Sequence, residues 1–130
     1  MVFVNLLDDP HNIPREEENE SCIEYKRHIV DISDKTLERR ISQMKRRLYD
    51  GYMLYDRLMC SYLLGVNDDG SIYGLDKKSR SKSMKNLRKM IDGCGMNARI
   101  ESIYVRKIKS KSYIVQVNIY ALSEPKDFIL

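Results

Sequence analysis

The alternation of hydrophobic and polar residues predicts three half-buried β-strands, at residues 22–32, 99–108 and 113–122. Residues 57–66 form a nearly continuous apolar run, which is typical of a central strand covered on both sides. The polar turn Asn67-Asp68-Asp69-Gly70 follows this run and leads to a short partner strand that carries Ile72. Because glycine adopts a positive φ and aspartate bonds the turn backbone, we expect a hairpin over residues 64–75.

Two other segments carry apolar side chains at the spacing of an amphipathic helix. Ser33 or Asp34 can cap the first helix, and Gly51 is expected to end it. Asp76 can cap the second, which we expect to end at Gly93 and Gly95. The apolar positions are Leu37, Ile41, Met44 and Leu48 in the first helix, and Met84, Leu87, Ile91 and Cys94 in the second.

The order of these elements, β-α-β-β-α-β-β, predicts the α+β class. Two helices would lie on one face of a mixed or antiparallel sheet, which makes a two-layer sandwich. A chain of 130 residues has room for one such domain, at residues 22–122. Residues 1–21 contain two prolines and no sustained period, so we expect an extended leader, and residues 123–130 form a C-terminal tail.

The charge is divided unevenly along the chain. The leader holds six acids and one base, whereas the other 109 residues hold 22 bases and 13 acids. The body is therefore distinctly basic, which favours a polyanionic partner. The apolar tip at residues 2–7 would suit insertion into a groove or channel of a large partner.

Three basic groups, at residues 45–47, 77–89 and 106–111, are the strongest functional signal in the sequence. Residues 77–89 hold seven bases and no acid, and the repulsion among these charges would be relieved by contacts with phosphates. The alternative is that these residues form an ordinary solvated surface. Tyr52, Tyr55 and Tyr104 could stack on splayed bases, or could pack in the core. The predicted RNA-binding residues are Lys45, Arg46, Arg47, Lys77, Lys78, Arg80, Lys82, Lys85, Arg88, Lys89, Arg106, Lys107, Lys109 and Lys111.

Other kinds of site have little support. Gly65, Gly70 and Gly74 lack the Gly-Lys-Ser/Thr ending of a phosphate-binding loop, and the histidines, His11 and His28, suggest no metal or catalytic arrangement. We therefore expect no cofactor, no metal and no small-molecule substrate. The remaining candidate for metal-assisted phosphodiester chemistry is the carboxylate pair Glu20 and Glu24, whose alternative is a pair of surface acids.

Several features indicate a cytoplasmic protein without a membrane partner. No apolar run approaches the roughly 20 residues of a membrane span, and residues 1–7 are too short for a signal sequence. Cys22, Cys60 and Cys94 form no CxxC pair, so we expect free thiols in a reducing compartment.

Several motifs resemble the N-terminal domain of the translational GTPases of the GTP-binding-protein-1 and -2 type, which are relatives of the elongation factors. They occur in the same order over residues 12–122: Ile23-Glu24-Tyr25-Lys26, then residues 43–48 with Gly51, then residues 65–70 with Gly74-Leu75, then residues 83–87 with Met90. In that family the last strand leads into the GTPase domain, whereas this sequence stops at Leu130. The resemblance implies a detached translation-factor domain that docks on ribosomal RNA and lacks GTPase activity.

Glu20-Ser21, Glu24-Tyr25-Lys26 and residues 64–70 are also similar to the Schlafen-type divergent AlbA domain. Some members of that family cleave tRNA or rRNA with clustered carboxylates. Glu20 and Glu24 match its first two acids, and the sequence offers no counterpart of the third.

Three hypotheses follow. The first is a non-catalytic protein that binds the ribosome, through rRNA and ribosomal proteins, and acts in translation as an inhibitory or dormancy (hibernation) factor. The second is a Schlafen-like, metal-dependent RNA endonuclease. The third is a stand-alone module that regulates a translational GTPase.

Overall fold

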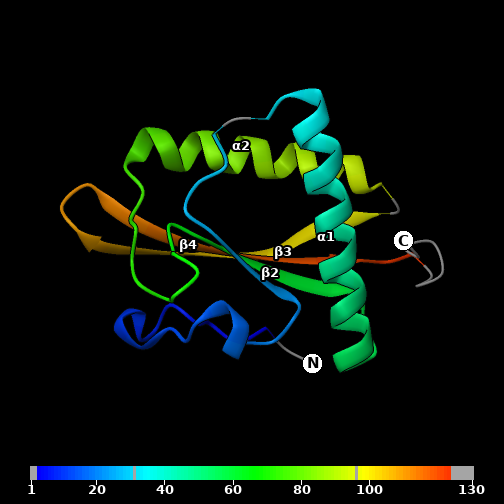
Figure 1. Cartoon of the computed structure of the whole chain (residues 1–130), viewed down its shortest axis with the longest axis horizontal. Helices are drawn as coiled ribbons and strands as arrows, with labels where there is room; N and C mark the ends of the chain where they lie inside the picture. The colour runs from blue at the N-terminus through cyan, green and yellow to red at the C-terminus, as the bar shows by residue number, and fades with distance from the viewer. Residues whose placement is uncertain (1–2, 31, 96, 124–130) are drawn as a thin grey trace.

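The computed structural model describes residues 3–30, 32–95 and 97–123, which form a helical layer over a sheet (Figure 1). Both helices cover the same face of the sheet, so the predicted α+β class is confirmed. The elements in chain order are β1 (Ile23–Lys26), α1 (Asp34–Tyr55), β2 (Met59–Leu64), α2 (Lys77–Cys94), β3 (Ala98–Lys109) and β4 (Ser112–Ala121).

The sheet is mixed, with the strand order β1-β2-β4-β3. β1 runs parallel to β2, while β4 is antiparallel to both β2 and β3. All six residues of β2 are buried, as expected of a central strand that is covered by the helices on one face and by the leader on the other. The predicted short strand after the 67–70 turn is present as two isolated bridges, Val66 with Ile72 and Leu75 with Tyr113.

β1 is much shorter than the strand predicted at 22–32, because side chains of α2 take over the backbone bonds of Ile29, three residues after β1 ends. Ile29 is fully buried. Its N–H donates to Ser83 Oγ at 2.9 Å, and its carbonyl accepts from Asn86 Nδ2 at 2.6 Å. These side-chain bonds replace a β-ladder and fix residues 27–30 beneath α2.

The predicted end of α1 at Gly51 is wrong. α1 continues to Tyr55, and Asp56 caps it in the left-handed conformation with a φ of 60°. Gly51 is buried in the helix because β2 begins directly against it: a Cβ added there would lie 1.8 Å from the Met59 carbonyl oxygen. This glycine therefore provides a close backbone approach and does not terminate the helix.

The ends of α2 follow the sequence prediction more closely. The Asp76 carboxylate accepts the backbone N–H of Ser79 at 2.7 Å, and Gly95 caps the C-terminus with a φ of 62°. Gly93 lies inside the helix and does not end it. A Cβ at Gly93 would lie 2.2 Å from Ile41 Cδ1, so this position belongs to the contact between the two helices.

The leader packs on the sheet face opposite the helices, where it forms two short 3-10 helices, Pro10–Asn12 and Glu16–Glu18 (Figure 1). Phe3 and Leu7 are buried in the fold. These two side chains of the predicted apolar tip are therefore taken up by the fold itself and are not free to enter a partner's groove. Residue 2 lies outside the described residues, and Val4 remains 64% exposed.

The leader is held by side-chain amides as well as by apolar contacts. Gln116 on β4 accepts the Leu6 N–H at 2.8 Å and donates to the Val4 carbonyl at 2.7 Å, although it is completely buried. Its amide also donates to Asn118 Oδ1 at 2.9 Å, and Asn118 bonds Ser61. The polar side chains in this row on the sheet therefore form hydrogen bonds with the backbone of the leader and with one another.

The described helices give no candidate for a membrane span.

We expect Gly51→Ala to destabilise the protein by about 1–3 kcal/mol or more, because the new methyl group would overlap the Met59 carbonyl. In an ordinary helix the same change is favourable. Urea unfolding followed by circular dichroism measures the difference. The control is Ser42→Ala at an exposed position of α1, which should change stability by less than about 0.5 kcal/mol. A Gly51→Ala variant as stable as the wild type would contradict the close approach.

Candidate nucleic-acid interface

One face of α2 carries a row of four exposed lysines at successive spacings of four, three and four residues: Lys78, Lys82, Lys85 and Lys89. This spacing places them along one side of a helix. Together with Val30 and Ile32 of the neighbouring segment they line a groove of about 520 Å³. We call this the lysine groove. The apolar floor and the row of ammonium groups suit a ligand that is long and negatively charged.

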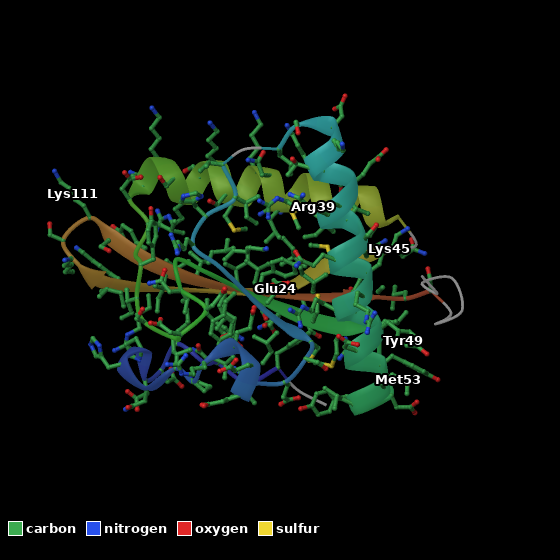
Figure 2. All side chains as sticks on the ribbon, in the orientation of Figure 1. Glu24, Arg39, Lys45, Tyr49, Met53 and Lys111 are labelled. Atoms are coloured by element: carbon green, nitrogen blue, oxygen red, sulfur yellow. The ribbon has the colours of Figure 1, made fainter. Side chains whose placement is uncertain are left out.

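The basic hairpin between β3 and β4 lies close to the start of α2. The bridge between Leu75 and Tyr113 joins the two elements, and the Arg80 guanidinium lies 4.3 Å from the centroid of the Tyr113 ring. The basic hairpin and the first turn of α2 thus lie at the same end of the molecule, where Figure 2 shows Lys111 at the tip of the hairpin. The exposed cations of the basic groups at residues 77–89 and 106–111, besides the four groove lysines, are Lys77, Arg88, Arg106, Lys107, Lys109 and Lys111.

Two of these predicted residues have contacts within the protein. Arg80 is half-buried against Tyr113, so its guanidinium is partly occupied. Arg106 is exposed and donates to the Asp8 carbonyl of the leader at 3.3 Å.

The third predicted group, Lys45-Arg46-Arg47, lies on α1 and separates into different environments. Arg46 is exposed and pairs with Asp50 at 3.5 Å, while Lys45 is half-buried. Arg47 points into the protein, where its Nε lies 3.1 Å from Glu24 Oε1. The guanidinium of Arg47 is neutralised and largely covered, so this predicted RNA-binding residue is less available to a phosphate than its exposed neighbour Arg46.

Arg47 is the centre of a partly buried charge cluster that joins α1, β1 and the leader. Its guanidinium also donates to the Ser21 carbonyl and lies 4.0 Å from Glu16 Oε2. The same Glu16 oxygen accepts the Tyr25 N–H at 2.6 Å. Burial raises the pKa of Glu16, and the nearby Glu24 raises it further. Burial opposes the charged form of Arg47, but the carboxylates of Glu24 and Glu16 raise its pKa.

The two carboxylates predicted for nuclease chemistry do not share a site. Glu24 is 3% exposed and paired with Arg47, beneath α1. Glu20 is exposed and lines a pocket on the leader side of the sheet. Within the described ranges, no group of three His, Cys, Asp or Glu residues could hold a metal ion. The three cysteines are free and buried.

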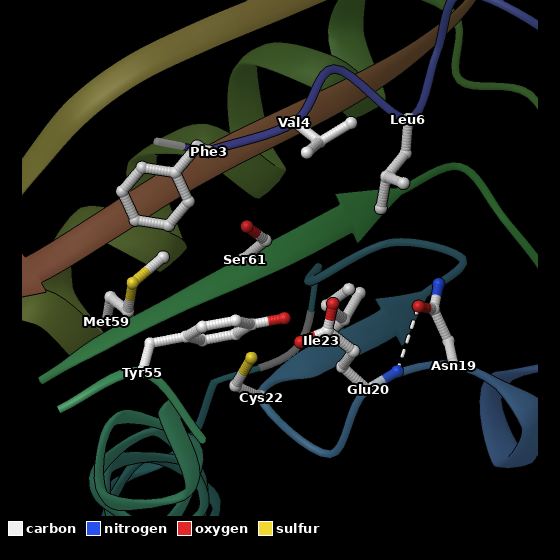
Figure 3. Close-up of a pocket in the computed structure, with 10 residues that line it drawn as sticks. All are labelled: Phe3, Val4, Leu6, Asn19, Glu20, Cys22, Ile23, Tyr55, Met59 and Ser61. Atoms are coloured by element: carbon white, nitrogen blue, oxygen red, sulfur yellow. Dashed lines mark hydrogen bonds between the residues drawn. The ribbon is translucent and has the colours of Figure 1, made fainter. Parts of the chain in front are cut away.

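The pocket that Glu20 lines has a volume of about 200 Å³ and lies between the leader, the sheet and the last turn of α1 (Figure 3). Its walls are mostly apolar, with Phe3, Ile23 and Met59 among them. This volume is below the roughly 300–1,000 Å³ of pockets for small molecules. It offers less to a ligand than the charged surface does.

The three tyrosines proposed to stack on bases are half-buried and pack against the core. Among the tyrosines of the described residues, the one whose ring is most open to solvent is instead Tyr73, which is 48% exposed. Strand alternation gave no reason to single it out. Its place between a polar turn and Gly74 was the available signal, because residues beside such a turn lie at the surface.

Comparison with known proteins finds partial matches to proteins named for GTP binding. The chain is 28% identical to human GTP-binding protein 2 over 131 residues and 32% identical to the mouse protein of that name over 93 residues. These matches cover 88% and 72% of this chain but only 21% and 14% of the two relatives. The chain therefore has a GTP-binding-protein-like relationship that is limited to a small part of each.

A third relative, an uncharacterised protein of Acanthamoeba polyphaga mimivirus, is 31% identical over 98 residues, which are 75% of this chain and 50% of that protein. No protein-family model matches the chain, and no solved structure matches it.

We expect Arg47→Ala to destabilise the protein by about 3–5 kcal/mol, because it would leave the Glu24 carboxylate buried without its partner. Arg46→Ala, one residue away, should cost less than about 1 kcal/mol because it breaks an exposed ion pair. Denaturant unfolding of the two variants tests this. Equal effects of the two substitutions would show that the buried cluster does not stabilise the fold.

Proposed function

We propose that the chain is a non-catalytic RNA-binding protein that binds the ribosome and acts in translation as an inhibitory or dormancy factor. The observation that carries the proposal is the lysine groove, where four exposed lysines follow one side of α2 and none of the described residues that line the groove is acidic. Lysines contact phosphates as point charges, so such a surface binds the RNA backbone with little sequence information.

The two-sided distribution of charge supports a ribosomal partner. The helix side carries the lysine groove, while the opposite side carries the exposed acids Asp8, Asp9, Glu17, Glu18 and Glu20 of the leader. RNA would meet the basic side, and basic ribosomal proteins would meet the acidic side. The resemblance to translational GTPases and the partial matches to GTP-binding protein 2 favour translation as the process.

The triple variant Lys82→Gln, Lys85→Gln, Lys89→Gln should weaken RNA binding and reduce the slope of log affinity against log salt by about 2, at roughly 0.7 for each lost contact to a single strand. Fluorescence anisotropy with ribosomal RNA fragments measures this. The control variant, Lys35→Gln, Arg15→Gln, Arg99→Gln, removes the same charge at three exposed and scattered positions. Equal losses in the two variants would exclude a localised site.

The ribosome itself is tested by sedimentation. Tagged protein should travel with ribosomes through a sucrose gradient at low salt and remain at the top at high salt. The lysine variant should remain at the top under both conditions. Wild-type protein that stays at the top even at low salt would overturn the ribosomal assignment.

We expect no cleavage of tRNA by the purified protein in the presence of Mg²⁺ or Mn²⁺, because Glu24 is paired with Arg47 and Glu20 faces a different region. Denaturing gel electrophoresis measures this. Metal-dependent cleavage that disappears in Glu24→Gln would replace the proposal with the endonuclease hypothesis, whereas cleavage unchanged in that variant would indicate a contaminating nuclease.

A second candidate function is a module that regulates a GTPase supplied by another chain, and the matches to proteins named for GTP binding favour it. Addition of the protein to a translational GTPase in the absence of ribosomes should then change its rate of GTP hydrolysis. An effect that appears only with ribosomes would return the explanation to ribosome binding.

A further inference from the structure

Tyr73 presents an aromatic ring to solvent between two basic neighbours. Its side chain is 48% exposed. The Arg27 guanidinium carbon lies 5.9 Å from the centroid of the Tyr73 ring, and the His28 ring meets it edge-on at 5.7 Å with an interplanar angle of 70°. The ring is thus supported by its neighbours and still offers about half of its surface to a ligand.

The backbone that carries Tyr73 is held in place. The N–H groups of Tyr73 and Gly74 both donate to the Gly65 carbonyl, at 2.8 and 2.9 Å. Gly74 has a φ of +81°, and a Cβ there would lie 2.3 Å from Ser112 Oγ on the basic hairpin. A ring on a fixed backbone loses little entropy when a ligand stacks on it.

Tyr73 lines one groove and contacts the chain segment that leads to the other. On one side it lines a groove of about 380 Å³, together with His11, Lys109 and Ser112. On the other side its partner His28 is two residues before Val30, which lines the lysine groove. The exposed ring therefore has Lys109 in its own groove and Arg27 beside it, and it contacts the segment that continues into the lysine groove.

We infer that the ligand is a single strand of RNA, whose backbone follows the lysine groove and one of whose bases stacks on Tyr73. This inference rests on the proposed RNA binding and adds the kind of RNA. In a duplex the bases are stacked on each other and unavailable to the ring, whereas every unpaired base has a free face. Arg27 would add a cation beside the stacked base.

The test compares a single-stranded RNA of about ten nucleotides, within the roughly 4–16 nucleotides of known single-strand sites, with a duplex of the same length. A 2-aminopurine in the single strand reports stacking by loss of its fluorescence. The protein variants are Tyr73→Ala and Tyr73→Phe. The control is Tyr49→Ala on α1, which lines neither groove (Figure 2).

We expect the wild type to prefer the single strand and Tyr73→Ala to bind it on the order of tenfold more weakly, without quenching of 2-aminopurine. Tyr73→Phe, which keeps the ring, and Tyr49→Ala should bind and quench as the wild type does. Thermal unfolding shows whether each variant is folded, and Tyr73→Phe keeps the test valid if Tyr73→Ala is not, since loss of quenching in a folded Tyr73→Phe would overturn stacking.

Two results would overturn the inference while leaving the proposed function intact: equal affinity for duplex and single strand, or unchanged quenching in Tyr73→Ala, each with binding still dependent on the lysines. Absence of any RNA binding by the wild type would overturn both.

Discussion

The guanidinium of Arg47 joins three parts of the structure that come from separate segments of the sequence. From α1 it reaches Glu24 on the edge strand β1 at 3.1 Å, the carbonyl of Ser21, and Glu16 of the leader at 4.0 Å. A charge removed from water is tolerated only when its partners are in place. Formation of this cluster therefore requires that the helix, the edge of the sheet and the leader take their positions together.

The two sides of the molecule differ in their exposed charges. Arg47 and Glu24 cancel each other inside the fold, whereas the lysines of α2 and the carboxylates of the leader remain exposed on opposite sides of the sheet. Because the sheet lies between the two sets, they do not neutralise each other at short range (Figure 1). The result is a small protein with one basic and one acidic side, although its net charge is only +4.

The sequence was a good guide wherever a local pattern decided the structure. Helical spacing, the Asp76 cap and strand alternation gave the elements and their order, because each depends on residues close in the chain. The sequence was a poor guide where contacts with a segment distant in the chain determine the structure. Gly51 is typical of a helix end, but its real neighbour is the Met59 carbonyl. The leader has the composition of an extended segment, yet Leu7 is buried against the sheet.

In the candidate site, too, local patterns could be predicted from the sequence and contacts between distant segments could not. The four groove lysines share one face because of their spacing, which can be read from the sequence alone. Arg47 belongs to the same basic stretch as Arg46, and only the position of Glu24 in space separates their roles. Tyr73 and His28 are 45 residues apart, so no local pattern could place their rings in contact.

The carboxamide of Gln116 has an evolutionary consequence. Buried in β4, it is satisfied by the backbone of Val4 and Leu6 and by Asn118. A relative that lost its leader would leave this amide without two of its partners, at a cost that selection would oppose. Position 116 and the presence of the leader should thus change together among relatives: where the leader is missing, an apolar side chain should occupy the position of the glutamine.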